Sequence, residues 1–219
     1  MISKLPKWVE FGAFILALVA GFVNAIGLLS FEHQSVSHLS GTATLLGTSF
    51  LNASFQSAIH LLGILLSFLF GSIIAGFLLH GSTLKLGRHY DTALFLESAL
   101  LLIALWFLSV GSPYGQFFSS AACGLQNALA TTYSGAVIRT THVTGIFTDL
   151  GIMLGEFMRG DALDKRKAKL FLIIIISFIF GGALGAFLYM KYQFMALFLP
   201  ICICLSIAVV YRVYSKDHS

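Results

Sequence analysis

Two histidines, His38 and His142, lie in two copies of one polar motif within a chain of 219 residues that is 58% hydrophobic. A histidine at membrane depth is costly and titrates near neutral pH, so this pair suits proton coupling or hydrogen bonding to a solute. The alternative for each is a neutral imidazole that bonds a backbone carbonyl of a neighbouring helix. A metal site is not expected, because no other His, Cys or carboxylate lies beside them at ligand spacing.

The motif copies belong to an internal repeat that runs through most of the chain. Residues 37–47 (SHLSGTATLLG) match residues 141–151 (THVTGIFTDLG). Three further matches keep the same order: 21–25 with 124–128, 67–71 with 177–181, and 93–97 with 196–200. Duplication of this kind is typical of transporter and channel architectures in membranes. We expect one membrane domain over residues 1–219, with repeats at about 10–110 and 114–213.

Polar and small residues around the two histidines complete a predicted solute path. If each motif begins a short helix inside the membrane, two helix N-termini approach one another, and their partial positive charges favour an anion or the electronegative end of a polar molecule. Packing of helices through small residues is the alternative for any one of these positions. The predicted path comprises Asn24, His38, Ser40, Gly41 and Thr42 in the first repeat, and Gln126, Asn127, His142, Thr144, Gly145 and Thr148 in the second.

Two carboxylates occur in the second motif segment without counterparts in the first. Asp149 and Glu156 lie seven and fourteen residues after His142, so all three share nearly one helical face. We expect them as a proton or charge site, although an interfacial ion pair with Arg159 is the more ordinary role for Glu156.

Composition and charge place the whole chain in a membrane. Only 10% of the residues are charged, against about a quarter in a soluble domain. The net charge of +4 reflects basic residues in the breaks between apolar runs, which indicates topology and no nucleic-acid partner. The three cysteines lie in apolar stretches and suggest neither a metal nor a disulfide framework. We expect the inner or plasma membrane, with both termini cytoplasmic.

The fold class is all-α: a bundle of transmembrane helices. Six segments reach the roughly 20 apolar residues of one crossing, at about 10–31, 58–80, 91–110, 114–134, 168–190 and 193–213. The motif segments, 37–54 and 141–158, are shorter. If they re-enter, each repeat has three spans, the repeats are inverted, and of the thirteen Lys and Arg only Lys191 lies outside. If they cross fully, eight spans form a parallel 4+4 repeat, and Lys85, Arg88, Arg139 and Lys191 lie outside.

At these motifs the sequence resembles the YoaK-like family of bacterial multi-pass membrane proteins, whose function is unknown. The resemblance covers nearly the whole chain, chiefly Gly21 to Gly47 and Gly124 to Gly151. Family members tend to have Asp at the position of Asn24 and Asn at that of Thr42. The resemblance implies a multi-pass membrane protein and names no substrate.

The predicted function is a transporter or channel for a small solute, an anion or small polar molecule, with its path between the two motifs. A non-catalytic sensor or assembly protein is the first alternative. An intramembrane enzyme is the second, and it lacks a Ser-Lys, Gly-x-Ser-x-Gly or His-Glu-x-x-His motif. No cofactor is expected. The expected partners are the lipid bilayer and a small-molecule or ion substrate, and the Gly-rich helix faces also allow a homo-oligomer.

Overall fold

The ordered elements of the chain are helices throughout the part that the structure describes. The computed structural model describes residues 8–30, 35–52, 55–79, 89–134 and 138–217. Apolar runs form helices in a bilayer because a helix satisfies its own backbone hydrogen bonds. The prediction of an all-α fold is confirmed for these residues. In chain order the helices are α1 (Trp8–Leu29), α2 (Leu39–Asn52), α3 (Phe55–Leu78), α4 (Tyr90–Ser109), α5 (Gly115–Ser134), α6 (Val143–Met158), α7 (Lys165–Tyr192), the 3-10 helix η2 (Gln193–Leu197) and α8 (Phe198–Asp217).

Several helices are long and apolar enough to cross a membrane. Among the described residues, four such stretches occur: Glu10–Leu29, Phe55–Leu78, Tyr90–Ser109 and Lys165–Val213. The last has 49 residues, more than twice the roughly 20 that one crossing requires. It contains α7 and most of α8, which are separated by η2, and the first residue of η2, Gln193, has a φ of 51°. The chain therefore has the character of a helical membrane protein.

Helix α5 corresponds to the predicted span 114–134 but is not one of these apolar stretches. It is rich in small and polar residues, including Ser119, Ser120 and Gln126, and most of its length is buried. Helices α1, α3 and α4 all pack against it. Since α5 contacts protein on several sides, it does not need the apolar surface of a helix that faces lipid.

The outer faces of α3 and α7 carry large apolar side chains that no other part of the described chain covers. Leu66, Phe70 and Phe77 on α3 are exposed, as are Ile176 and Ile179 on α7. In water such surfaces would mark an interaction site, whereas in a bilayer the lipid tails cover them.

The two repeats are interleaved, because each one packs its first helix against the third helix of the other. Helix α1 lies along α7, and α5 lies along α3. At the first crossing, Gly21 approaches the Phe178 carbonyl so closely that an added Cβ would overlap it. At the second, Gly124 approaches the Phe68 carbonyl in the same way. Gly21 is matched by Gly124 in the sequence repeat, and Phe178 by Phe68, so the same contact is made twice.

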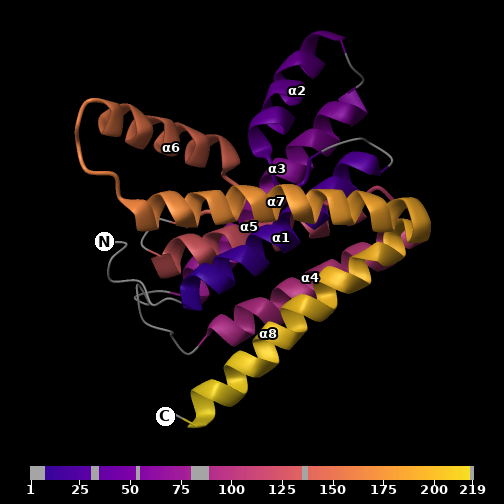
Figure 1. The fold of residues 1–219 in the computed structure, drawn as a ribbon. Helices are drawn as coiled ribbons and strands as arrows, with labels where there is room; N and C mark the ends of the chain where they lie inside the picture. Colours follow the sequence, from indigo (N-terminus) through magenta and orange to yellow (C-terminus); the bar gives the residue numbers. More distant parts are fainter. Residues whose placement is uncertain (1–7, 31–34, 53–54, 80–88, 135–137, 218–219) are drawn as a thin grey trace.

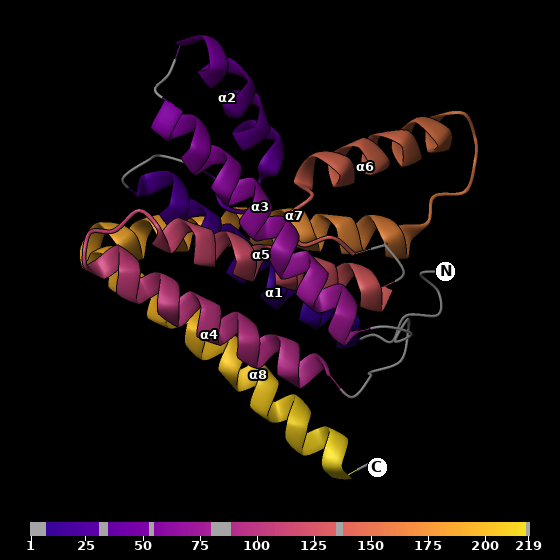
Figure 2. The same ribbon diagram turned by 180° about the vertical axis from the view of Figure 1, so that it is seen from behind.

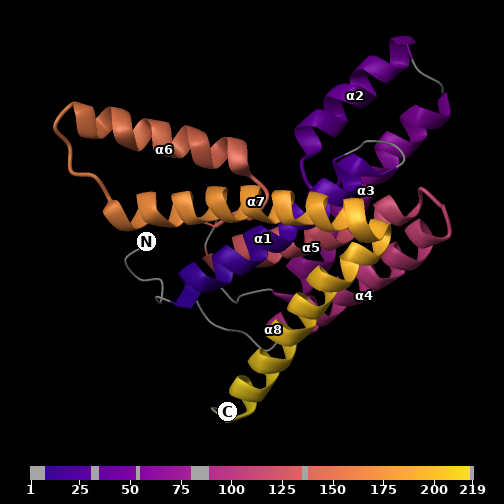
Figure 3. The same ribbon diagram turned by 45° about the vertical axis from the view of Figure 1, so that its right-hand side comes forward.

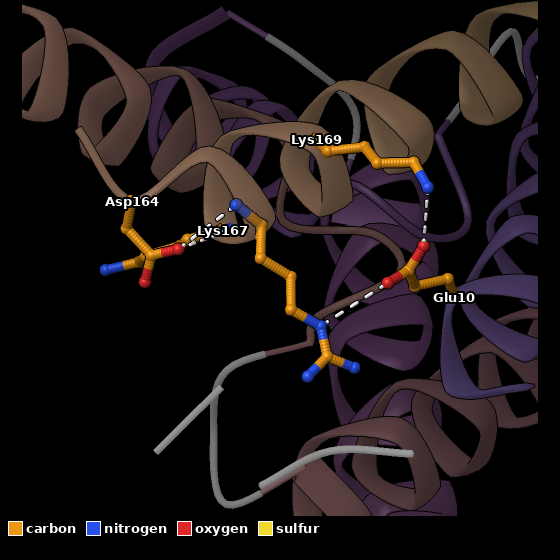
Figure 4. A network of polar contacts seen from close by, with 5 residues as sticks. Glu10, Asp164, Lys167 and Lys169 are labelled. Carbon is orange, nitrogen blue, oxygen red and sulfur yellow. Dashed lines mark hydrogen bonds and ion pairs between the residues drawn. The ribbon is translucent and has the colours of Figure 1, made fainter. Parts of the chain in front are cut away.

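Residue contacts define the relative directions of the helices. The Glu10 carboxylate near the start of α1 contacts Nε of Arg166 (3.5 Å) and Nζ of Lys169 (2.9 Å) near the start of α7, so these helices run in parallel (Figure 4). The Asp164 side chain caps the first turn of α7 by accepting the backbone N–H of Arg166 and Lys167. Figure 4 shows both groups of contacts at this end of the bundle.

Helices α4 and α8 run in opposite directions. The Asp91 carboxylate near the start of α4 lies 3.9 Å from Nε of Arg212 near the end of α8. Further along α4, Glu97 contacts Cys204, which is earlier in α8. The two helices lie side by side along one edge of the molecule in both Figure 1 and Figure 2.

The short helices α2 and α6 project from the bundle. Both begin near the middle of the molecule and diverge as they run outward (Figure 3). Helix α2 packs against α3, and α6 packs against α7, so each contacts the helix that follows it in the sequence. Their first residues are therefore the parts that come closest to the centre of the bundle.

Candidate solute-binding site

Side chains satisfy the non-helical backbone that leads into α2. Oδ1 of Asn24 on α1 accepts hydrogen bonds from the Ser35 hydroxyl (2.7 Å) and from the backbone N–H of Ser37 (3.2 Å). Oγ of Ser35 in turn accepts the backbone N–H of His38 (2.9 Å), and the Thr42 hydroxyl donates to the Ser35 carbonyl (3.1 Å). Because buried backbone groups need partners, these bonds fix where α2 begins.

The segment that leads into α6 is held differently. Oγ of Ser134 accepts the backbone N–H of Ile138 (2.7 Å), and the backbone N–H of Ile146 donates to the His142 carbonyl (3.1 Å) in the first turn of α6. The His142 ring lies against Gly145, where an added Cβ would meet the imidazole. Asn127, the counterpart of Asn24, has a buried Oδ1 that no described residue bonds.

One cavity of about 500 Å³ joins the starts of α2 and α6. The first repeat lines it with Ser37, His38, Leu39, Ser40 and Phe68. The second repeat lines it with Asn127, Thr131, Arg139, Thr141, His142 and Thr144. This volume is within the range of small-molecule sites, about 300–1,000 Å³. The structure thus brings five of the predicted path residues to one cavity: His38, Ser40, Asn127, His142 and Thr144.

The other predicted path residues lie outside the cavity lining. Asn24 and Thr42 are buried and hold the segment before α2. Gly145 lies against the His142 ring, and Gln126 is buried within the bundle. The two remaining positions, Gly41 and Thr148, are exposed on α2 and α6.

The two predicted carboxylates of α6 are also outside the lining. Asp149 and Glu156 are exposed, whereas the side of α6 that is buried carries Ile146 and Met153. Seven-residue spacing places Asp149 and Glu156 on nearly one side of a helix, and both are exposed on α6. That spacing does not specify which side faces the bundle.

Comparison with protein families assigns the chain to a family but supplies no activity. A family model described as "Protein of unknown function (DUF1275)" matches residues 12–210. The chain belongs to the DUF1275 family. This membership is compatible with the resemblance found at the two motifs. Comparison with curated proteins and with solved structures gives no match.

Arg139 lines the cavity of this DUF1275 protein, although the solute path predicted from the sequence did not include it. It is exposed and lines the cavity next to the start of α6. In the sequence, Arg139 counted only as one of the basic residues that indicate membrane topology. The repeat offers a signal, because Arg139 stands where the first repeat has Ser35, inside a segment that leads into a motif. Thr131 was also predictable, since it follows Asn127 by one helical turn on the same face.

The cavity wall favours negative charge. Residues at the starts of α2 and α6 line the cavity, and each helix start carries about half a positive charge, to which Arg139 adds a full one. No carboxylate is among the described residues of the lining. The Ser37 hydroxyl is buried and has no hydrogen-bond partner among the described residues, and the same is true of Oδ1 of Asn127. Buried polar atoms normally have partners, so these two atoms are exceptions at the residues that line the cavity.

Proposed function

We propose that this member of the DUF1275 family is a transporter or channel for a small anion or for a polar molecule with an electronegative end, and that the solute passes between α2 and α6. One observation carries the proposal: a single cavity is lined by the motif residues of both repeats, with His38 and His142 both in its wall. Irregular backbone at membrane depth survives only where protein buries it or a water-filled cavity receives it. Polar groups in such a place mark a pathway.

We further propose that the repeats are inverted, with α2 and α6 as re-entrant helices and the other six helices as spans. The direction of α4 relative to α8 and the place where α2 and α6 begin support this topology. Helices α1 and α7 run in parallel, which both topologies require. Helices α4 and α8 run antiparallel, whereas eight full spans in a parallel repeat would direct them the same way. Helices α2 and α6 also begin near the middle of the molecule (Figure 3).

The topology is tested with a cysteine at the start of α4. Thr92 is exposed there, and six spans put it on the cytoplasmic side whereas eight put it outside. In sealed vesicles of known orientation, a membrane-impermeant maleimide should label the T92C variant from the cytoplasmic side. Labelling from the opposite side would reject the inverted arrangement.

The path is tested without knowledge of the solute. Cysteines replace Ser40 on α2 and Thr144 on α6 in separate variants, in a chain whose exposed Cys202 is changed to serine. Anionic and cationic methanethiosulfonate reagents of similar size are then applied from each side. A path through the cavity predicts that both positions react from both sides, with the anionic reagent faster. The R139Q variant should bring the two rates together, because the local positive charge is reduced.

Two outcomes of this experiment would reject the proposal. If neither position reacts from one of the two sides, the cavity is a pocket and the chain is better explained as a sensor or assembly protein. If the cationic reagent reacts faster and R139Q has no effect, the cavity does not select anions. A matched cysteine at exposed Thr148, one turn beyond Thr144 and outside the lining, should show no charge preference.

A further inference from the structure

Glu97 is a carboxyl group enclosed in the interior of the bundle, away from the cavity lining. It lies on α4 with 2% of its surface exposed. Its Oε1 accepts a hydrogen bond from Sγ of Cys204 on α8 (3.3 Å), and its Oε2 has no hydrogen-bond partner among the described residues. Enclosing an acid is costly where an apolar side chain would pack without that cost. An ionisable residue at membrane depth is a candidate for function.

The packing of α4 against α5 places an amide opposite this carboxyl group. The ring of Tyr90 on α4 contacts that of Tyr133 on α5, with centroids 5.6 Å apart. The helices run antiparallel, since Leu108 late in α4 lies near Gly115 at the start of α5. Seven residues are almost two helical turns, so residues seven apart lie on nearly the same side of a helix. Because the two helices are antiparallel, the residue seven after Tyr90 on α4 and the residue seven before Tyr133 on α5 lie at the same interface.

That step leads to Glu97 on α4 and to Gln126 on α5. Gln126 is 1% exposed, and neither Oε1 nor Nε2 of its amide has a partner among the described residues. The next residue, Asn127, lines the cavity. The step of seven thus assigns the Gln126 amide to the same helix interface as the Glu97 carboxyl group, and the next amide belongs to a residue that lines the cavity.

The titratable groups that face Glu97 are thiols. Cys204 contacts it from α8, and Cys123 on α5 is close enough to interact with it electrostatically. The 3-10 helix η2, which also packs against α4, contains no titratable residue. No lysine or arginine of the described chain forms an ion pair with Glu97. Its charge, when present, is therefore uncompensated by those residues.

We propose that Glu97 carries a proton that moves together with the solute, and that the amides of Gln126 and Asn127 connect it to the cavity. The inference rests on the proposed transport function. Water molecules hydrogen-bonded to the two amides would form the route from the cavity. A hydronium ion at the inner end of that route gives its proton to the carboxylate, leaving water and a neutral acid, and the reverse transfer releases the proton on the other side. Because the proton and a monovalent anion carry opposite charges, loading both leaves the net charge of the protein unchanged.

The test uses the full chain in liposomes that enclose the pH dye pyranine. Inward gradients of chloride, nitrate, sulfate, inorganic phosphate and succinate are applied in turn. At least one should acidify the interior of wild-type vesicles. With that anion, E97Q should lose the acidification but retain exchange of labelled external anion for internal anion, because exchange needs no net proton movement. The C202S variant changes an exposed cysteine of α8 that does not bond Glu97, and it should still acidify.

Each other result has a defined meaning. If the wild type moves none of the five anions, the proposed transport of such anions fails, and this inference fails with it. If the wild type moves an anion but E97Q acidifies equally, only the inference fails. Loss of exchange along with acidification in E97Q would assign Glu97 to folding or to the path, and overturn the coupling role. If D149N and not E97Q loses acidification, the proton site is on α6.

Discussion

The interleaving of the repeats makes a specific prediction about Gly21 on α1. In the G21A variant the new methyl group would overlap the backbone carbonyl of Phe178 on α7. A backbone atom cannot rotate away as a side chain can, so α1 and α7 must separate and lose contacts along their crossing. Overpacking of this kind costs about 1–3 kcal/mol. The equilibrium constant for unfolding should rise by a factor of about 5 or more.

The repeat supplies both a replicate and a control. G124A should cost the same as G21A, because Gly124 meets the Phe68 carbonyl in the equivalent way. G12A on α1 should change stability by less than about 0.5 kcal/mol, since no described atom lies within 4 Å of the added carbon. The two crossings involve different pairs of helices, so the cost of the G21A/G124A double variant should equal the sum to within about 0.5 kcal/mol.

Reversible unfolding by SDS in mixed micelles, followed by circular dichroism, measures these differences in purified protein. The reasoning would be refuted if G21A were as stable as G12A, because the close crossing would then not exist in solution. It would also be refuted if G21A and G124A differed by more than about 1 kcal/mol, since equivalent contacts would then be unequal.

Two further predictions concern polar contacts. N24A should destabilise the chain by about 1–3 kcal/mol, because the buried N–H of Ser37 loses its acceptor. N127A should leave the free energy of unfolding nearly unchanged, because Oδ1 of Asn127 has no described partner to lose. E10Q should cost less than about 1 kcal/mol, because its partner Lys169 is largely exposed, and the difference from wild type in SDS unfolding should shrink as salt is added. A loss that persists at high salt would mean that Glu10 acts through packing.

Much of the helical layout was predictable, because hydrophobic length in a bilayer has few interpretations. The apolar runs and the two shorter motif segments correspond to α1 to α8, and the repeat predicted equivalent helices. The pairing of α1 with α7 was not predictable. Small residues such as Gly71 and Gly181 indicate a close crossing, but they do not name the helix that crosses. In the structure both make close crossings within the chain: Gly71 lies against the Ala121 backbone, and Gly181 lies against the Leu18 backbone.

The candidate site was predicted in part for a similar reason. Each motif predicted a helix start, and the repeat suggested that the two starts approach one another, so His38 and His142 were candidates from the sequence alone. Arg139 was missed because a basic residue between apolar runs ordinarily reports topology. Spacing placed Asp149 on a helix face with His142, but the direction of that face depends on how α6 packs against α7.

The divergence of the two repeats suggests where a solute is bound. Both carry an asparagine at the same position, yet Asn24 uses its carbonyl oxygen to hold the segment before α2, whereas the equivalent oxygen of Asn127 is left without a described partner at the cavity. Ser35, which completes the first network, is replaced by Arg139 in the second repeat. A charged side chain and an amide oxygen without a described partner thus stand where the first repeat has internal hydrogen bonds. We infer that the first repeat mainly provides a rigid wall, and that the second provides most of the groups that bind the solute.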